Sequence, residues 1–256
     1  MQNLQDLRLA VLIDADNIPF GNVKGMLEEI AKYGIPTFKR IYGDWTKPTV
    51  SGWKSVLLEN AITPVQQYSY TQGKNATDSA MIIDAMDILY SGKVDGFCIV
   101  SSDSDFTRLA TRLREAGMRV IGIGERKTPS PFIIACDKFI YIEILTSSAQ
   151  EQYQSRKKGG KPVRKDQKSK ETEQQVQTRK TKQLIASSIT DLADENGWAY
   201  LGDVGNLILK KQPDFDPRNF GFTKLTPLIK SFDFEIDERD SGQNNIKHIY
   251  IRNRKP

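Results

Sequence analysis

Short apolar runs alternate with longer amphipathic patterns over the first half of the chain, and this alternation restricts the fold more than any other feature. Six runs are typical of strands: Leu9–Ile13, Thr37–Tyr42, Ile62–Gln67, Gly96–Val100, Met118–Ile123 and Phe139–Ile142. Helical spacing marks the segments between them: Val23–Tyr33, Trp53–Asn60, a helix capped by Thr77 and running to about Tyr90, Phe106–Leu113 and the short Phe132–Ala135. The sequence therefore predicts an α/β fold in which helices sandwich a parallel sheet with strand order 3-2-1-4-5.

Acidic residues follow two strands that are neighbours in this order. Asp14 and Asp16 come directly after the first strand, and Asp103 and Asp105 come directly after the fourth. The carboxyl ends of these strands meet where the strand order reverses, which is where such sheets bind ligands. Asp78 lies at the start of the helix that leads into the fourth strand, so it joins the other carboxylates only if the preceding loop folds over this edge.

Converging carboxylates imply a particular chemistry. Without an interleaved base they repel one another, unless some are protonated or a cation lies among them. Hard oxygen ligands suit Mg²⁺ or Mn²⁺, and such ions activate water and stabilise the oxyanions of phosphoryl displacement. The single histidine, His248, lies in a predicted hairpin and argues against histidine or zinc chemistry. The pattern therefore indicates hydrolysis of a phosphoester.

A purely structural interpretation competes with this one. A single aspartate after a strand often caps a helix or closes an Asx turn, so Asp103 or Asp105 alone is explained that way. Two pairs at adjacent strand ends are less well explained as four caps. Asp16 is either an extra carboxylate or an outward-facing one. Asp84 and Asp87, three residues apart in mid-helix, are interpreted as a solvated face.

The composition changes sharply near Ser147. Residues 151–182 contain eleven Lys/Arg and four Asp/Glu, a net charge of +7 that leaves the rest of the chain at −2, because the whole chain is at +5. So polar a stretch buries too little surface to offset its ordering entropy. We predict a domain at 1–147, a flexible basic linker at 148–178 with a frayed helix near its end, and a second domain at 179–256.

The last segment has the pattern of a winged helix. Leu184, Ile185, Ile189, Leu192 and Ala193 form an amphipathic stripe, and further helices are predicted at Val204–Leu209 and Gly221–Ser231. A β-hairpin is predicted from Phe232–Ile236 and Ile246–Ile251, joined by the polar turn Glu238–Asn245.

The remaining composition favours a cytoplasmic protein. Cys98 and Cys136 lie in or beside apolar runs without a CxxC motif, as expected of free thiols in a reducing compartment. The start of the chain lacks the pattern of a signal peptide, and no apolar stretch reaches the length of a membrane span.

Three motifs resemble those of the NYN domains of the bacterial LabA-like group. They are VLIDADN, GKNATD and IVSSDSDF, the last followed by LREAGMRVIGIG, and the resemblance spans residues 8–143. It implies a PIN-like fold and a metal-dependent ribonuclease that hydrolyses RNA. Carried over by position, it implies Asp14, Asp78, Asp103 and Asp105 as metal ligands and catalytic carboxylates, Asn17 as the residue that orients substrate or water, and Lys74 as an RNA contact. The sequence departs from the family at Ala15, Asp16 and Asn75, and none of these changes removes a ligand.

The run GWAYLGDVGNLILKKQPDFDPRNFGFTKLTPLIKSFDFEID and the closing IKHIYIR resemble an OST-HTH, or LOTUS, domain. The resemblance implies RNA binding or docking of a protein partner. Candidate contacts are basic and aromatic residues: Lys210, Lys211, Arg218, Phe220 and Lys224. Eight apolar residues are interpreted as its core: Trp198, Leu201, Val204, Leu207, Leu225, Leu228, Ile229 and Phe232.

Two other functions fit parts of the sequence. Asp14 and Asp16 match the DxD of haloacid-dehalogenase-like phosphatases, in which the first aspartate is the nucleophile, although Ile18 stands where Thr or Val is usual. A noncatalytic RNA-binding or regulatory adaptor with a PIN-like fold is the other alternative. The complete set of carboxylates favours the nuclease, because an adaptor has no chemical reason to hold repelling charges together.

Overall fold

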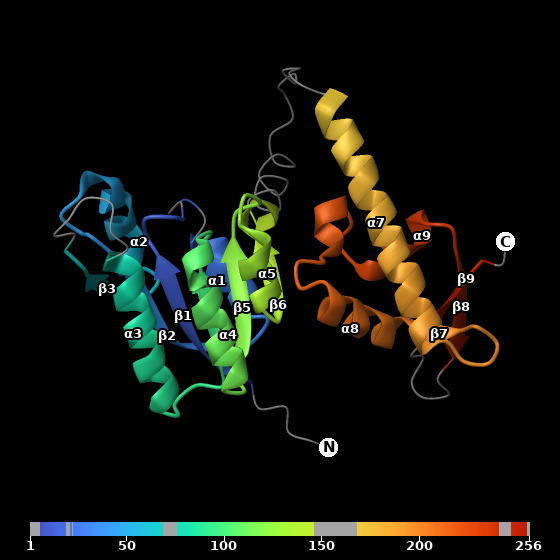
Figure 1. Cartoon of the computed structure of the whole chain (residues 1–256), viewed down its shortest axis with the longest axis horizontal. Helices are drawn as coiled ribbons and strands as arrows, with labels where there is room; N and C mark the ends of the chain where they lie inside the picture. Colours follow the sequence, from blue (N-terminus) through green and yellow to red (C-terminus); the bar gives the residue numbers. More distant parts are fainter. Residues whose placement is uncertain are drawn as a thin grey trace. The chain divides into compact units, whose positions relative to one another are not determined.

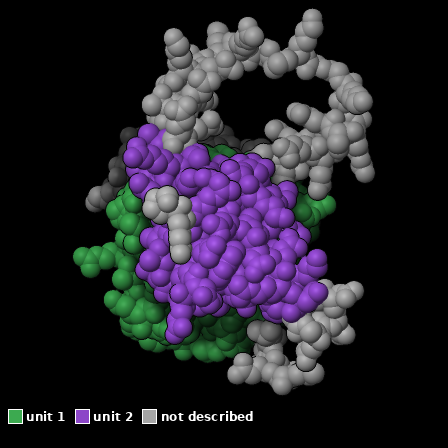
Figure 2. All heavy atoms as spheres, turned by 90° about the vertical axis from the view of Figure 1, so that its right-hand side faces the viewer, with its two compact units in different colours: residues 1–156 green, residues 157–256 purple. Residues whose placement is uncertain are grey.

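The chain folds into two compact units, residues 1–156 and 157–256, which Figure 2 colours separately. The computed structural model describes residues 6–18, 21, 23–68, 76–145, 168–240 and 247–254. Lys74 and Asn75 lie outside these ranges, as do residues 148–167 of the predicted linker. No helix in the described ranges is both long enough and apolar enough to cross a membrane. Cys98 and Cys136 are both buried and free, as predicted.

The first unit is built around one parallel sheet (Figure 1). Its strands are β1 (Arg8–Asp14), β2 (Ile35–Gly43), β3 (Thr63–Gln66), β4 (Gly96–Val100), β5 (Arg119–Gly124) and β6 (Lys138–Tyr141). Its helices are α1 (Val23–Ile30), η2 (Pro48–Trp53), α2 (Lys54–Leu57), α3 (Ala76–Tyr90), η3 (Ser104–Phe106), α4 (Thr107–Glu115) and α5 (Ser130–Ala135). The strand order β3-β2-β1-β4-β5-β6 confirms the predicted order of the first five strands and places the predicted sixth strand at the edge, beside β5.

Helices cover both faces of this sheet because its central strands are apolar on both sides. Leu9 and Ile13 of β1 pack with residues of α1 and α2, whereas Leu12 packs with residues of α3, α4 and α5. Figure 1 shows α3 and α4 in front of the sheet. Burying such a side chain contributes about 1.5–3 kcal/mol. The alternation continues to the end of the strand, so Asp14 shares the side of Leu12, which α3 covers.

The second unit has a helical core against a small antiparallel sheet of order β7-β9-β8. Its elements are α7 (Lys168–Leu192), β7 (Ala199–Tyr200), α8 (Leu201–Lys211), η4 (Pro217–Phe220), α9 (Leu225–Ser231), β8 (Phe234–Asp240) and β9 (Lys247–Asn253). Ile189, Val204, Ile208, Ile229 and Ile251 are almost fully buried at its centre. The pattern of helices followed by a hairpin therefore agrees with the sequence.

One local prediction about this unit is confirmed and another needs correction. The helix predicted near the end of the linker is present, because α7 begins at Lys168 and includes residues 168–178. The predicted helix Gly221–Ser231 was too long: Gly221 has φ +79° and ends η4, and α9 begins at Leu225. A positive φ is strained for residues with a Cβ, and it stops the helical turn at this glycine.

Candidate metal centre

The two central strands deliver acidic residues to one edge of the sheet. Asp14 is the last residue of β1, and Asp103 follows β4 after two serines. Ile13 pairs with Val100 in the register of these strands, so both loops leave the sheet side by side. This is the edge at which the strand order reverses, where parallel sheets bind ligands.

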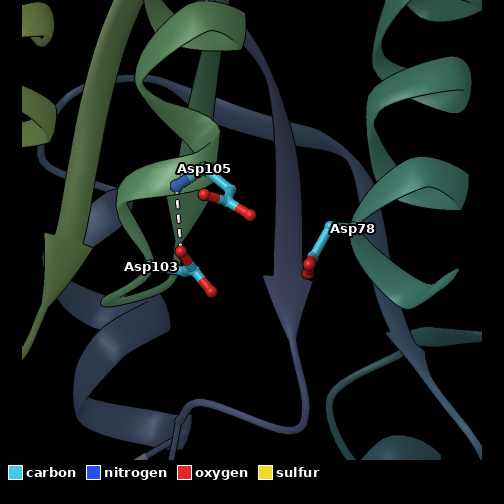
Figure 3. Close-up of side chains that lie close together, drawn as sticks. All are labelled: Asp78, Asp103 and Asp105. Carbon is cyan, nitrogen blue, oxygen red and sulfur yellow. Dashed lines mark hydrogen bonds between the residues drawn. The ribbon is translucent and has the colours of Figure 1, made fainter. Parts of the chain in front are cut away.

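Three carboxylates converge here. Asp78, Asp103 and Asp105 each present an oxygen, and these oxygens lie within 4.8 Å of one another. Figure 3 shows Asp78 on α3 facing Asp103 and Asp105, which come from the segment after β4. The uncertainty about Asp78 that the sequence pattern left is therefore resolved, since the start of α3 does lie over this edge. The set offers one ion several oxygen donors.

Asp103 both caps a helical turn and joins this cluster. Its Oδ1 accepts a hydrogen bond of 2.9 Å from the backbone N–H of Asp105, the second residue of the η3 turn. Its own N–H donates to the Ser101 hydroxyl at 3.1 Å. The cap uses one oxygen and fixes the direction of the other, so the structural and the ligand interpretations hold together at this residue.

Asp14 lies deeper than the cluster and is 1% exposed. Its Oδ2 accepts hydrogen bonds from the Asn17 amide at 2.7 Å and from the Ser101 hydroxyl at 2.8 Å, and its Oδ1 accepts one from the Asp16 N–H at 3.1 Å. Burial raises the pKa of Asp14, and the bonds from Asn17 and Ser101 oppose that rise. Asp14 is thus a rigidly oriented carboxylate beside the three that converge.

The electrostatic cost of the cluster is concentrated on Asp78. The pKa of Asp78 is raised to about 6, first because the side chain is buried and then because of the charges on Asp14, Asp103 and Asp105. Only 8% of Asp78 is exposed. The N-terminal turn of α3 favours a negative charge, yet this effect does not offset burial and repulsion. A cation among these oxygens would remove the repulsion.

Asp16 is not one of the three converging carboxylates, and it is exposed. Its Oδ2 accepts a hydrogen bond from the Thr77 hydroxyl at 3.3 Å. Thr77 is therefore not the cap predicted for α3, which begins one residue earlier, at Ala76. The contact instead joins the loop after β1 to the first turn of α3 and so holds Asp78 near Asp14.

A second polar contact anchors α3 and corrects another prediction. Asp84 is not part of a solvated face: it accepts hydrogen bonds from the Tyr42 hydroxyl and the Arg40 guanidinium, both on β2. Burial and the bond to Asp84 raise the pKa of Tyr42 well above its usual range. Helical periodicity predicted Asp84 on the solvated face, because its partners lie on a strand that is distant in the sequence. Asp87, one turn later, is exposed as predicted.

Ser101 is the residue of this site that sequence reasoning missed. It is fully buried, donates to Asp14 and accepts from the N–H of Asp103, so it joins the two acidic loops. The neighbouring β5 comes very close here: a Cβ on Gly124 would lie 2.6 Å from the Ser101 carbonyl oxygen. The polar run after the apolar strand β4 was the sequence signal that could have indicated Ser101. The hydrogen bond from Ser101 to Asp14, however, depends on the position of β1.

The predicted RNA contacts of the second unit differ in their surroundings. Lys210 and Lys224 are exposed. Lys211 forms an ion pair with Asp191 at 2.6 Å, and Arg218 forms one with Asp216 at 2.7 Å. Phe220 packs against the core and was wrongly expected at the surface.

The predicted core of this unit is mostly confirmed. Six of its residues are buried in the core cluster or packed against it: Leu201, Val204, Leu225, Leu228, Ile229 and Phe232. Trp198 and Leu207 do not belong to that cluster. Trp198 instead lies under the guanidinium groups of Arg239 and Arg252. The sequence placed it inside because tryptophan is usually buried.

Comparison with known proteins agrees with this architecture. The family model of the NYN domain matches residues 8–143, more than half of the chain. The chain belongs to the NYN family. Its first unit accordingly has the PIN-like NYN fold, and the model of the OST-HTH/LOTUS domain matches residues 173–246 of the second unit. We refer to the two parts as the NYN unit and the OST-HTH unit.

Two solved structures are similar to part of this NYN protein. A protein of unknown function from Vibrio parahaemolyticus is 20% identical, with a TM-score of 0.46, covering 56% of this chain and 96% of that one. An uncharacterized protein from Nitrosomonas europaea is 26% identical, with a TM-score of 0.27, covering 39% of this chain and 84% of that one. No curated protein matches the chain.

Proposed function

We propose that this NYN protein is a metal-dependent ribonuclease that hydrolyses RNA phosphodiester bonds with its NYN unit. The observation that carries the proposal is the convergence of Asp78, Asp103 and Asp105 at the reversal point of the sheet. Membership of a family with a PIN-like nuclease fold and the presence of an OST-HTH unit support RNA as the substrate.

The residues of this site fit a divalent metal. All donors in the cluster are carboxylate oxygens, and the raised pKa of Asp78 reflects burial and then like charges, which a cation would neutralise. Such a donor set suits Mg²⁺ or Mn²⁺ rather than a metal that prefers sulfur or imidazole. Asp78, Asp103 and Asp105 would hold the ion, with Asp14 as a fourth ligand. Bound there, the metal would polarise the phosphoryl oxygens and acidify a water molecule.

The protein's own contribution is orientation. The amide of Asn17 and the hydroxyl of Ser101 fix the position of Asp14 and favour its ionised form, because each donates to its carboxylate. We propose that Asn17 acts through this contact. The N–H of Asp105 fixes Asp103 in the same way. Carboxylates held so firmly lose little freedom when a ligand binds, which favours catalysis.

The OST-HTH unit is proposed to hold the RNA. Among the residues predicted from sequence, Lys74 lies outside the described residues, and Lys210 and Lys224 are exposed, so these three are the proposed phosphate contacts. Lys211 and Arg218 remain candidates although each already contacts a carboxylate. The boundaries 1–147, 148–178 and 179–256, the basic linker, a protein partner of the OST-HTH unit and the cytoplasm as compartment are likewise proposals.

The decisive experiment compares Asp103→Asn with the parent protein on labelled single-stranded RNA in Mg²⁺, Mn²⁺ or EDTA. The substitution removes the charge, while the asparagine carbonyl can still accept the capping bond from Asp105. We expect cleavage only with metal, and a loss of about 100-fold in the variant, the effect of removing one transition-state stabiliser. Asp87→Asn, an exposed change on α3, should leave cleavage intact.

Other outcomes would assign other functions. RNA binding without cleavage under any metal would overturn the nuclease and support the adaptor. Turnover of p-nitrophenyl phosphate, lost in Asp14→Asn and unaccompanied by RNA cleavage, would support the phosphatase. Cleavage that persists in EDTA or in Asp103→Asn would contradict the proposed metal site.

A further inference from the structure

The outward face of the small sheet in the OST-HTH unit carries aromatic rings where polar residues are usual. Along β9, Ile249 and Ile251 face the core, so the residues that alternate with them, His248, Tyr250 and Arg252, face outward. On β7, Ala199 is buried and Tyr200 is 38% exposed. Several aromatic rings therefore lie on the side of the sheet that faces away from the hydrophobic core.

Trp198 joins this surface through the turn that precedes β7. The backbone N–H of Trp198 donates to Oδ1 of Asp194 at 2.8 Å, and the preceding residue, Gly197, has φ +83°. Only glycine adopts that conformation without strain, and a Cβ there would lie 3.2 Å from Cδ of Arg252. The turn therefore directs the indole toward the sheet rather than into the core.

Rings and guanidinium groups follow one another across the surface. The guanidinium carbon of Arg252 lies 4.6 Å from the centre of the Trp198 ring, and that of Arg239 lies 5.6 Å from it. Arg239 also lies 4.2 Å from the centre of the Tyr250 ring. Ring centres are 5.8 Å apart for Tyr250 and Tyr200, and 5.4 Å apart for Tyr200 and His248. We call these six residues the aromatic face: Trp198, Tyr200, Arg239, His248, Tyr250 and Arg252.

The charges of this face are largely balanced. Arg239 donates to Asp237 at 2.8 Å, and Arg252 donates to Glu235 at 3.0 Å. A basic patch for phosphates would carry an excess of positive charge, whereas these groups are held by carboxylates of the same sheet. The face therefore carries little net charge, and it presents the flat surfaces of rings and guanidinium groups. Such surfaces bind other planar groups by stacking.

We propose that the aromatic face binds single-stranded RNA by stacking unpaired bases on Tyr200, Tyr250 and Trp198. Unpaired bases are planar, and proteins bind them by stacking on aromatic rings and guanidinium planes arrayed on a sheet. A duplex hides its bases within the helix, so it does not fit this surface. We choose RNA rather than a protein as the ligand of this face because it lies in an OST-HTH unit, a module that suggests RNA binding. The inference shares its RNA ligand with the proposed nuclease but not its site.

Affinity for labelled single-stranded RNA, measured in EDTA with the full chain, tests this surface apart from cleavage. We expect Tyr250→Thr, which keeps a strand-forming residue, to weaken binding about tenfold, or ~1.4 kcal/mol. Tyr200→Leu should have a similar effect. Tyr250→Phe keeps the ring and should bind as the parent does. The losses should be equal at low and high salt, and the affinity for a duplex of the same sequence should not change.

Fluorescence gives a second measurement that a merely structural role would not affect. Single-stranded RNA should quench part of the tryptophan emission, and Trp198→Phe should abolish that part. Lys210→Ala and Lys224→Ala serve as controls on other elements of the unit, and their effect should depend on salt.

Named results would overturn the inference. The inference is wrong if Tyr200→Leu and Tyr250→Thr bind RNA with an affinity within twofold of the parent. It is also wrong if Tyr250→Phe and Tyr250→Thr lose the same amount of affinity. Loss of a protein partner with unchanged RNA affinity would assign the face to protein docking. If the protein cleaves RNA with metal but Tyr200→Leu and Tyr250→Thr do not change RNA affinity, only the proposal for the aromatic face is refuted. Binding through the face without cleavage would refute only the nuclease.

Discussion

The two units treat charge in opposite ways. The NYN unit brings carboxylate oxygens of three residues within 4.8 Å of one another, and burial together with these neighbouring charges raises the pKa of Asp78 to about 6. The OST-HTH unit places each guanidinium of its aromatic face between a ring and a carboxylate. Gathered like charges destabilise a fold until a ligand neutralises them, whereas balanced pairs stabilise the sheet on which they lie. The first arrangement therefore calls for a cation, and the second leaves planar surfaces available.

The largest expected effect tests whether the units are stabilised separately. Ile208 is fully buried in the core of the OST-HTH unit, so Ile208→Ala should cost that unit about 2–5 kcal/mol. The NYN unit has its own two-sided core and should keep its stability. Urea unfolding followed at Trp198 for one unit and at Trp45 and Trp53 for the other measures both. Equal destabilisation of the two would show that they fold as one body.

The next effect tests the gathered charges. At a Mn²⁺ concentration 100 times its Kd, binding should stabilise the NYN unit by about 2.7 kcal/mol. Asp105→Asn removes one of the three converging carboxylates and should abolish most of this gain. Asp87→Asn on the exposed side of α3 should retain it. Thermal unfolding with and without Mn²⁺ measures the difference, and an undiminished gain in Asp105→Asn would contradict the site.

A smaller effect has an unusual sign. The pKa of Asp78 in the folded chain, about 6, is above that of an ordinary aspartate, so the folded state holds the proton more tightly. Without metal, stability should fall as the pH rises from about 4 to about 6. Asp78→Asn should then stabilise the metal-free protein at pH 7.5 by about 1 kcal/mol, a value discounted for solvent screening, and should not do so near pH 4. Urea unfolding in EDTA at both pH values checks this, and a destabilised variant at pH 7.5 would refute it.

The smallest effect concerns a paired carboxylate at the other end of the sheet. Two hydrogen bonds from the Arg8 side chain and one from its N–H lower the pKa of Asp95 to about 2. Its stabilising effect should be complete above pH 4 and disappear as the pH falls through 2. Asp95→Asn should therefore slightly lower the melting temperature at pH 7, opposite in sign to Asp78→Asn. Thermal scans of the two variants side by side test this contrast.

Most of the fold was predictable because local pattern and global topology agree. The apolar strands of the NYN unit are buried on both faces. Their alternation with helices favours the strand order that is common in parallel sheets. Errors arose where a local signal was ambiguous. Thr77 looks like a cap but donates to Asp16, and Gly221 looks like a helix start but ends a turn. In both cases a contact or a backbone angle decided the outcome.

The candidate site was predictable in composition more than in geometry. The order of the strands implied that Asp14 and Asp103 lie together, and the family motif added Asp78. The different role of Asp14 was not predictable, because it follows from the hydrogen bonds of Ser101 and Asn17. Asp84 was misassigned for the same reason, since its partner Tyr42 lies on another strand.

The sequence by itself determined which residues can form strands, helices and a row of acids at strand ends, because periodicity and strand termini are local properties of the chain. Only the tertiary structure decided which three carboxylates converge, that burial and neighbouring charges raise the pKa of Asp78, and that Trp198 leaves the core for a surface shared with Arg239 and Arg252. These outcomes depend on distances between segments far apart in the chain. Repulsion, burial and stacking vary steeply with such distances, and no local pattern encodes them.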